Sequence, residues 1–316
     1  MLNLATTIKT IKENFSDAQN QYQIPIYQRK YEWGTEQVEA LLNDIIEHLR
    51  ANPAIDITNA AGPANLLIPK YLIGSIFLYK ANFNPAEPEI FIIDGQQRIT
   101  TITLIAMVLR KKIQESLDIA SAEPTFDQAF RNNYITSFIT PIEGVYKFPI
   151  NPFAQNVEHK TKIKVSHEVN FYQKLSTLNF DADISGNIIT NRILKNIRAI
   201  EASLVVYEGV DYPASIRLNN LCIIAGALMN FTNMAVIVAE SPASQIANHT
   251  EVINIFSKIN ARGKDLSQSD LLKVDFLQGE NANNNNGIAN QWDTAFENVE
   301  PIPESVSRLP ARPISI

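Results

Sequence analysis

Cysteine and histidine are scarce in this sequence. Its 316 residues include one cysteine, Cys222, and four scattered histidines. A single cysteine excludes an internal disulfide and a cysteine cluster for zinc, and no histidines stand at metal-binding spacing. Because it lies within an apolar run, Cys222 is expected to be a buried small hydrophobe.

Charge is also sparse, and it carries no positive excess. Charged residues make up 19% of the chain, and the net charge at pH 7 is −6. This balance excludes a whole-chain basic field for gripping DNA, although a local basic patch is compatible with it. Hydrophobic residues make up 45%, which is typical of a folded protein.

Signals for export or membrane insertion are missing as well. Residues 1–15 carry Lys9 and Lys12 among spaced apolar residues, without the continuous apolar segment of a signal peptide. Residues 218–239 have no charge, but asparagines and a threonine would lie near mid-bilayer, which is unfavourable in hydrocarbon. We therefore expect a buried helix over about 213–229, a buried strand over about 234–239, no membrane association and a cytoplasmic location.

Hydrophobic periodicity predicts an α+β fold with three regions. In residues 1–120 it predicts helices over 7–15, 35–49 and about 96–117, an extended segment over 22–27, and strands over 71–79 and 89–93. Residues 121–278 are expected to be mainly helical, with loops near 140–160 and 180–187. Residues 279–316, rich in asparagine and proline, are expected to form a loose tail.

The strongest chemical signal follows the predicted strand 89–93. It consists of Asp94, Gly95, Gln96, Gln97 and Arg98, with Thr100 just beyond. A turn that opens a helix presents unpaired amides and a partial positive charge to an anion. Arg98 adds a forked donor, and Asp94 can hold Mg²⁺ or orient a water. A purely structural alternative is that Asp94 caps the helix and Arg98 pairs with a surface acid.

Two further segments combine charge with other polar or aromatic groups. Residues 24–33 bring Gln28, Arg29 and aromatic rings such as Tyr27 close together, which suits phosphate and base contacts, or a strand edge with solvated charges. Residues 256–273 place Asn260 and Arg262 in a helix-to-helix turn. These two side chains can reach into a binding site, or they can donate hydrogen bonds to the free carbonyl groups at the end of the helix.

Taken in order, these segments resemble the N-terminal domain family of GmrSD-type restriction endonucleases, itself similar to the ParB/sulfiredoxin superfamily. The resemblance is carried by Ile-Pro-x-Tyr-Gln-Arg at 24–29 with Trp33, Leu-Ile-Gly-Ser at 72–75, Ile-Asp-Gly-Gln-Gln-Arg-x-Thr-Thr at 93–101 and Ile-Asn-Ala-Arg-Gly-Lys-x-Leu-Ser at 259–267. It implies a small ParB-like mixed α/β core over residues 1–120, followed by a mostly helical region.

The resemblance also implies a nucleotide-dependent DNA restriction factor of a defence system. It assigns catalysis of nucleoside triphosphate hydrolysis to Asp94, Gln97 and Arg98, with Mg²⁺ as the expected ion. Nucleotide contacts are expected from Gly95, Gln96, Thr100, Gln28, Arg29 and Tyr27, and Asn260 and Arg262 form a possible additional site. DNA is an expected partner, directly or through a nuclease domain or subunit.

The chain departs from many relatives in one respect. Those relatives continue into an HNH-type nuclease domain with a histidine-bearing metal site, whereas the last histidine here is His249. The sequence is therefore compatible with a fragment, with a partner that cuts the DNA, or with a sensor. Two alternatives to the hydrolase stay open, namely a non-catalytic nucleotide- or DNA-sensing module and a metal-dependent nuclease that uses the same turn.

Overall fold

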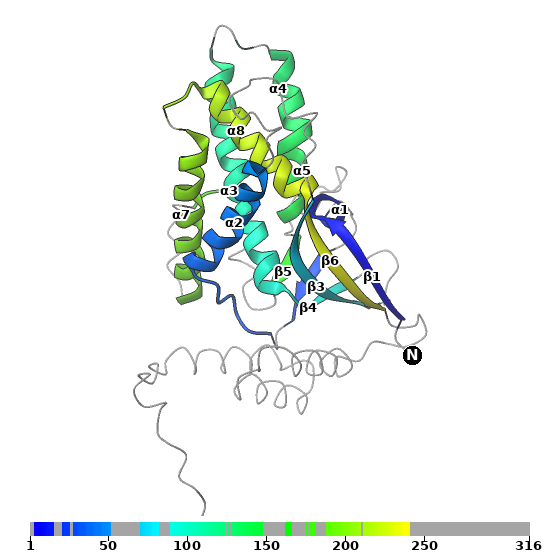
Figure 1. Cartoon of the computed structure of the whole chain (residues 1–316). Helices are drawn as coiled ribbons and strands as arrows, with labels where there is room; N and C mark the ends of the chain where they lie inside the picture. The colour runs from blue at the N-terminus through cyan, green and yellow to red at the C-terminus, as the bar shows by residue number, and fades with distance from the viewer. Residues whose placement is uncertain are drawn as a thin grey trace, which may run out of the picture.

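The computed structural model describes residues 3–15, 21–25, 28–51, 70–81, 89–123, 126, 128–147, 162–165, 175, 177–180, 188–209 and 211–240. Within these ranges the chain forms a six-stranded mixed sheet beside a group of helices (Figure 1). This arrangement confirms the predicted α+β class. The ParB/sulfiredoxin likeness of the core stays a prediction.

The strands lie across the sheet in the order β1-β6-β3-β4-β2-β5. Their bounds are β1 (Asn3–Thr10), β2 (Gln21–Ile24), β3 (Tyr71–Ala81), β4 (Glu89–Asp94), β5 (Ile163–Val165) and β6 (Thr232–Glu240). Strand β2 runs parallel to β4, and β3 runs antiparallel to it. The C-terminal ends of β2 and β4 and the N-terminal end of β3 therefore lie at the same end of the sheet. Strands β5 and β6 join this sheet from beyond residue 120.

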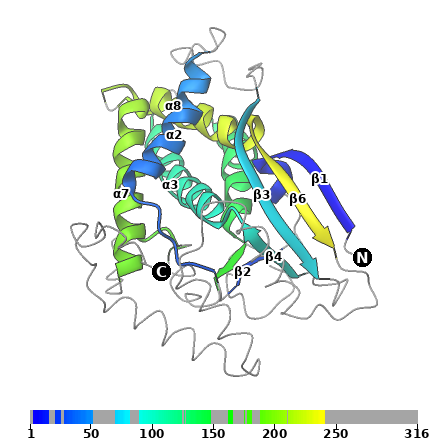
Figure 2. The ribbon, with the colours of Figure 1, turned by 60° about the horizontal axis from the view of Figure 1, so that its bottom comes forward.

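The longest helix is α3, and it occupies the middle of the helical layer. The helical segments are α1 (Ile11–Phe15), α2 (Thr35–Arg50), α3 (Gln96–Ser121), α4 (Gln128–Tyr134), α5 (Thr140–Tyr146), α7 (Ile188–Glu208) and α8 (Ala214–Gly226), with π-helical turns η2 (Ile135–Ile139) and η3 (Ala227–Phe231). Helix α3 leads from the end of β4 into the layer and packs against α5, α7 and α8 (Figure 2). Most of its apolar side chains are buried, so the packing of the helix holds its first turn in place.

Several sequence predictions are confirmed. Helices cover 35–50 and 96–121, and strands cover 71–81 and 89–94. The uncharged stretch forms α8 and η3 and then β6, close to the expected boundaries, and Cys222 is fully buried. Among the described residues, no helix combines the length and the apolar character needed to cross a membrane.

Two local predictions are wrong. The helix expected from Thr7 begins only at Ile11, because residues 3–10 form β1 and pair with β6. Pairing with a distant strand and the β-branched content of this segment outweigh the helical spacing of its apolar residues. The loop expected near 140–160 is wrong for its first residues, since Thr140–Tyr146 is α5, and residues 148–160 lie outside the described residues. The structure also places a short strand, β5, in the region expected to be mainly helical.

A buried carboxylate ties three helices together. Glu208, at the end of α7, lies 3.0 Å from Lys112 Nζ of α3 and 3.6 Å from an Arg217 nitrogen of α8. Asn220 Nδ2 donates to the Glu208 carbonyl oxygen at 3.1 Å. Removing one member of such a group is unfavourable, since the remaining charges stay desolvated.

We predict that Glu208→Ala lowers the free energy of unfolding by about 2–4 kcal/mol, because Lys112 and Arg217 lose their buried counter-charge. Urea unfolding followed by circular dichroism measures this loss. Glu47→Ala, in α2, is the control. Its pair with Arg50 is exposed on both sides, so its loss is expected to be about 1 kcal/mol or less. Equal losses in the two variants would contradict the prediction.

Candidate functional site

The turn from β4 into α3 depends on Gly95. This residue caps the helix with φ of +90°, a left-handed conformation that favours glycine. A Cβ here would lie 2.7 Å from Ile76 Cγ2 and 3.2 Å from the Ser75 oxygen, so β3 leaves no room for a side chain. The Gly95 amide donates to Asp94 Oδ1 at 2.7 Å. The exposed carboxylate is thereby fixed at the mouth of the turn.

The first turn of α3 has unpaired donors. Its first intrahelical hydrogen bond runs from the Ile99 amide to the Gly95 oxygen at 3.0 Å. No described residue accepts a hydrogen bond from the amides of Gln96, Gln97 or Arg98, and no side chain caps them. Such amides at a helix N-terminus favour a bound anion.

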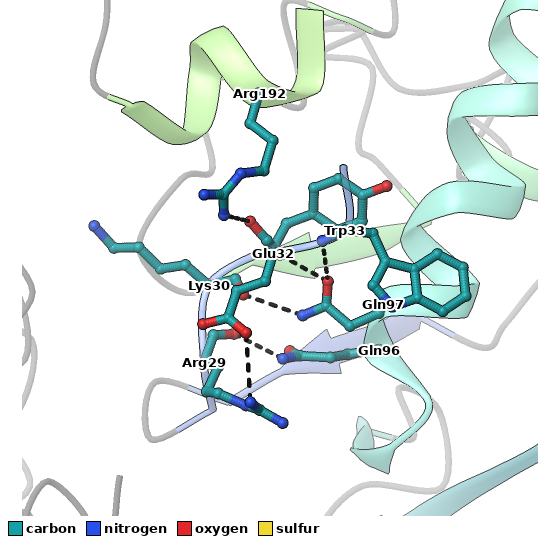
Figure 3. Close-up of polar contacts among 8 residues, drawn as sticks. Arg29, Lys30, Glu32, Trp33, Gln96, Gln97 and Arg192 are labelled. Carbon is teal, nitrogen blue, oxygen red and sulfur yellow. Dashed lines mark hydrogen bonds and ion pairs between the residues drawn. The ribbon is translucent and has the colours of Figure 1, made fainter. Parts of the chain in front are cut away.

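The Gln97 side chain holds the loop formed by residues 29–33. Its Oε1 accepts from the backbone amides of Glu32 at 2.8 Å and Trp33 at 3.2 Å, and its Nε2 donates to the Lys30 oxygen at 3.1 Å. Figure 3 shows these bonds between the helix and the loop. The amide group is therefore engaged with backbone, which indicates a positioning role beside the predicted catalytic one.

Tyr31 anchors the same loop to α3 and α7. Its hydroxyl lies 2.8 Å from Thr101 Oγ1 and accepts from Asn196 Nδ2 at 3.2 Å. Thr101 Oγ1 donates its hydrogen to the backbone carbonyl oxygen of Gln97. The Tyr31 hydroxyl is therefore the donor toward Thr101. Burial raises the pKa of Tyr31 above its ordinary value, so the hydroxyl stays protonated. Arg192 NH1 donates to the backbone carbonyl oxygen of Tyr31 at 3.2 Å, which adds a contact from α7.

Arg98 lies against the beginning of β3. Its NH1 donates to the Ser75 oxygen at 2.7 Å. Gly74, at φ of +115°, lets the guanidinium approach closely, since a Cβ there would lie 2.9 Å from Arg98 Cζ. A guanidinium has five N–H donors, so Arg98 keeps donors for a ligand.

Gln28, which lies four residues after the end of β2, fixes the end of β4. It is 1% exposed, and its Nε2 donates to the oxygens of Ile92 and Ile93. Both contacts fall just before Asp94. Gln28 was predicted to contact nucleotide, and these bonds give it a structural part in shaping the turn.

Arg29 follows at the start of the loop. The Arg29 oxygen accepts from Gln96 Nε2 at 2.7 Å, and its side chain lies 3.4 Å from Glu32 in a partly exposed ion pair. Such a surface pair is weak and can yield to a stronger partner. The guanidinium is therefore available to an anion.

These groups surround one half-open cavity of about 250 Å³. Its lining residues are Gln28, Arg29, Trp33, Ser75, Ile93, Asp94, Gly95, Gln96, Gln97 and Arg98. Two arginines and one carboxylate give the lining a net positive charge, despite the negative charge of the chain. The cavity therefore suits a polyanion.

The other predicted site residues fall elsewhere. Thr100 is buried in α3 and is not among the lining residues. Tyr27, Asn260 and Arg262 lie outside the described residues. Among the described histidines, cysteines and acidic residues, no group of three or more is placed to hold a metal ion. Asp94 is the carboxylate that lines the cavity.

A comparison with protein-family models matches residues 11–277 to the GmrSD restriction endonuclease N-terminal domain. The match covers most of the chain and includes every residue that lines the cavity. This chain belongs to the GmrSD N-terminal domain family. No curated protein matches it.

In this GmrSD N-terminal domain, sequence reasoning missed two residues of α7. Asn196 and Arg192 hold the loop from α7. A signal for Asn196 was present, because it follows Ile193 by three residues and precedes Ile200 by four on the buried face of the helix. A polar residue on an apolar face points to a buried hydrogen bond, but its partner is set by tertiary packing.

Gly95→Ala is predicted to lower the free energy of unfolding by about 2–4 kcal/mol, because the left-handed conformation and the contact with Ile76 both oppose a Cβ. Urea unfolding measures the change. Gly144→Ala is the matched control, since Gly144 lies in α5 and its Cβ would have no neighbour within 4 Å. That variant is expected to be neutral or slightly more stable. Comparable destabilisation of both would contradict the assignment.

Proposed function

We propose that this chain binds a nucleoside triphosphate and hydrolyses it, as the nucleotide-handling module of a DNA restriction system in defence against foreign DNA. The observation that carries the proposal is the convergence of two arginines, a helix N-terminus and one carboxylate on the same cavity. Membership of a restriction endonuclease family supports the link to DNA.

Phosphate binding rests on donors from two elements. Arg98 and the first amides of α3 face the cavity from one side, and Arg29 faces it from the loop. Forked guanidinium groups match phosphate oxygens, and helix amides add directed hydrogen bonds. We assign the triphosphate to this donor set, with the γ-phosphate toward Asp94.

Asp94 supplies the one negative group in the lining. Its Oδ1 accepts from the Gly95 amide, and no described residue donates to Oδ2. That oxygen fits a Mg²⁺ ion shared with phosphate oxygens, because magnesium sites with substrate phosphates use one or two carboxylates. Magnesium bound there would offset negative charge on the phosphates. Asp94 would also orient the attacking water.

DNA is the second partner that we propose for this chain. The family name joins the domain to a restriction endonuclease, and the net charge of −6 gives the whole chain no field for DNA. We therefore propose that DNA is reached through a local patch, or through a nuclease domain or subunit. Nucleotide state would then control that nuclease.

A second candidate is a non-catalytic nucleotide-sensing module. The engagement of Gln97 with the loop favours it, because that side chain is not free to orient a water in this arrangement. In this case nucleotide occupancy alone would switch a partner. Turnover and binding measured in the same variants separate the two candidates.

Asp94→Asn is expected to lower phosphate release by about 100-fold or more, since general base and metal roles typically contribute that much. Asparagine keeps an oxygen for the Gly95 amide, so the turn is retained. Release is measured with Mg²⁺ for each common nucleoside triphosphate, with and without DNA. Asp211→Asn, at an exposed turn, is the control and is expected to match the native chain.

Binding in the same variant tests the second candidate. Affinity for a non-hydrolysable triphosphate without Mg²⁺ should be kept or increased in Asp94→Asn, because a negative charge beside the phosphates is gone. Native binding without turnover, with or without DNA, would support the sensing module. Absence of binding to the native chain would overturn both candidates.

Arg98→Ala and Arg29→Ala are each expected to weaken binding of inorganic triphosphate about 10- to 100-fold, because each removes a charge-assisted hydrogen-bond donor. Isothermal titration calorimetry measures the affinities. Arg198→Ala is the matched control for Arg29→Ala, since each arginine pairs with the glutamate three residues further along the chain. A similar loss in Arg198→Ala would point to a general charge effect.

A further inference from the structure

One aromatic ring lines the polar cavity. Trp33 is the aromatic member of the described lining, and Ile93 is the other large apolar one. Trp33 is partly buried and packs against the hydrophobic core, and it is one of the residues that line the cavity. An indole supported from behind offers a flat surface for a planar ligand group.

The Trp33 backbone is fixed at both ends. Its amide donates to Gln97 Oε1 at 3.2 Å, and its oxygen accepts from Asn196 Nδ2 at 2.7 Å. Helices α3 and α7 thus hold this residue between them, as Figure 3 shows on the α3 side. The backbone is held before any ligand arrives, and packing against the core restricts the ring, which lowers the entropy lost on binding.

Tyr31 lies in the same segment but is unsuited to the same task. Its side chain is 6% exposed and is not among the lining residues. Its hydroxyl is bonded to Thr101 and Asn196. A ligand would have to displace both contacts to reach this ring.

We propose that Trp33 is the base-stacking residue of the site, so that the ligand is a complete nucleotide and not a bare polyphosphate. This inference rests on the proposed function and extends it from the phosphates to the base. Stacking on an aromatic ring accepts every base, because each base has a π-face. Trp33 therefore contributes affinity for nucleotides over inorganic triphosphate, and choice among bases needs other contacts.

Fluorescence of the full chain gives a direct test, because it contains two tryptophans, Trp33 and Trp292. In a Trp292→Phe variant the emission comes from Trp33. Non-hydrolysable analogues of the four ribonucleoside triphosphates are expected to quench it, and inorganic triphosphate is not. A variant with both tryptophans changed to phenylalanine is the control, and it should show no tryptophan emission for the analogues to quench.

Affinities then separate stacking from loop positioning. Trp33→Leu is expected to bind the nucleotide analogues about tenfold or more weakly and to bind inorganic triphosphate unchanged, whereas Trp33→Phe should keep most of the affinity. Equal weakening for both probes, or no weakening for either, would overturn the stacking role alone. Failure of both probes to bind the native chain would overturn the proposed function, and this inference with it.

Discussion

The bonds from the Gln97 side chain to the backbone of residues 30–33 connect the two halves of the site. One half is the β4–α3 turn, and the other is the loop after β2. An amide offers an acceptor and a donor at fixed positions, so it can match only one register of the loop backbone. The placement of Arg29 and Trp33 beside Asp94 follows from that match.

This connection needs a rigid base, and the interior of α3 supplies it. The helix is buried along most of its length and packs on α5, α7 and α8, so its first turn cannot shift freely. Helix α7 is tied to α3 through Glu208 at one end and touches the loop through Asn196 and Arg192 further along. A displacement of the loop would thus alter its hydrogen bonds to Asn196 and Arg192 of α7.

Two glycines decide how closely the β4–α3 turn and Arg98 approach β3. Gly95 lets the turn press against β3, and Gly74 lets the Arg98 guanidinium lie against the same strand. Both have positive φ, which suits glycine. Without these two positions the arginine and the helix amides could not share one cavity with the end of β4.

Much of the fold was predictable from the sequence, because it depends on local order. The strand 89–94, the turn at Gly95 and the long helix after it come from a β-rich run, a break and an apolar period that are adjacent in the chain. The same holds for α2 and for the pair α8 and β6. Local spacing failed at residues 7–10, where pairing of β1 with β6, more than 200 residues away, overrides it.

The sequence by itself determined the order of strand, turn and helix around Asp94–Arg98, and it predicted an anion site there together with the segment 24–33. Only the tertiary structure decided the partner of each side chain. It directs Gln97 to the loop, buries Tyr31 and Thr100, and leaves Trp33 on the cavity. The reason is physical, since a polar side chain bonds to whichever group packing brings within reach, and that group is set by contacts between residues far apart in sequence.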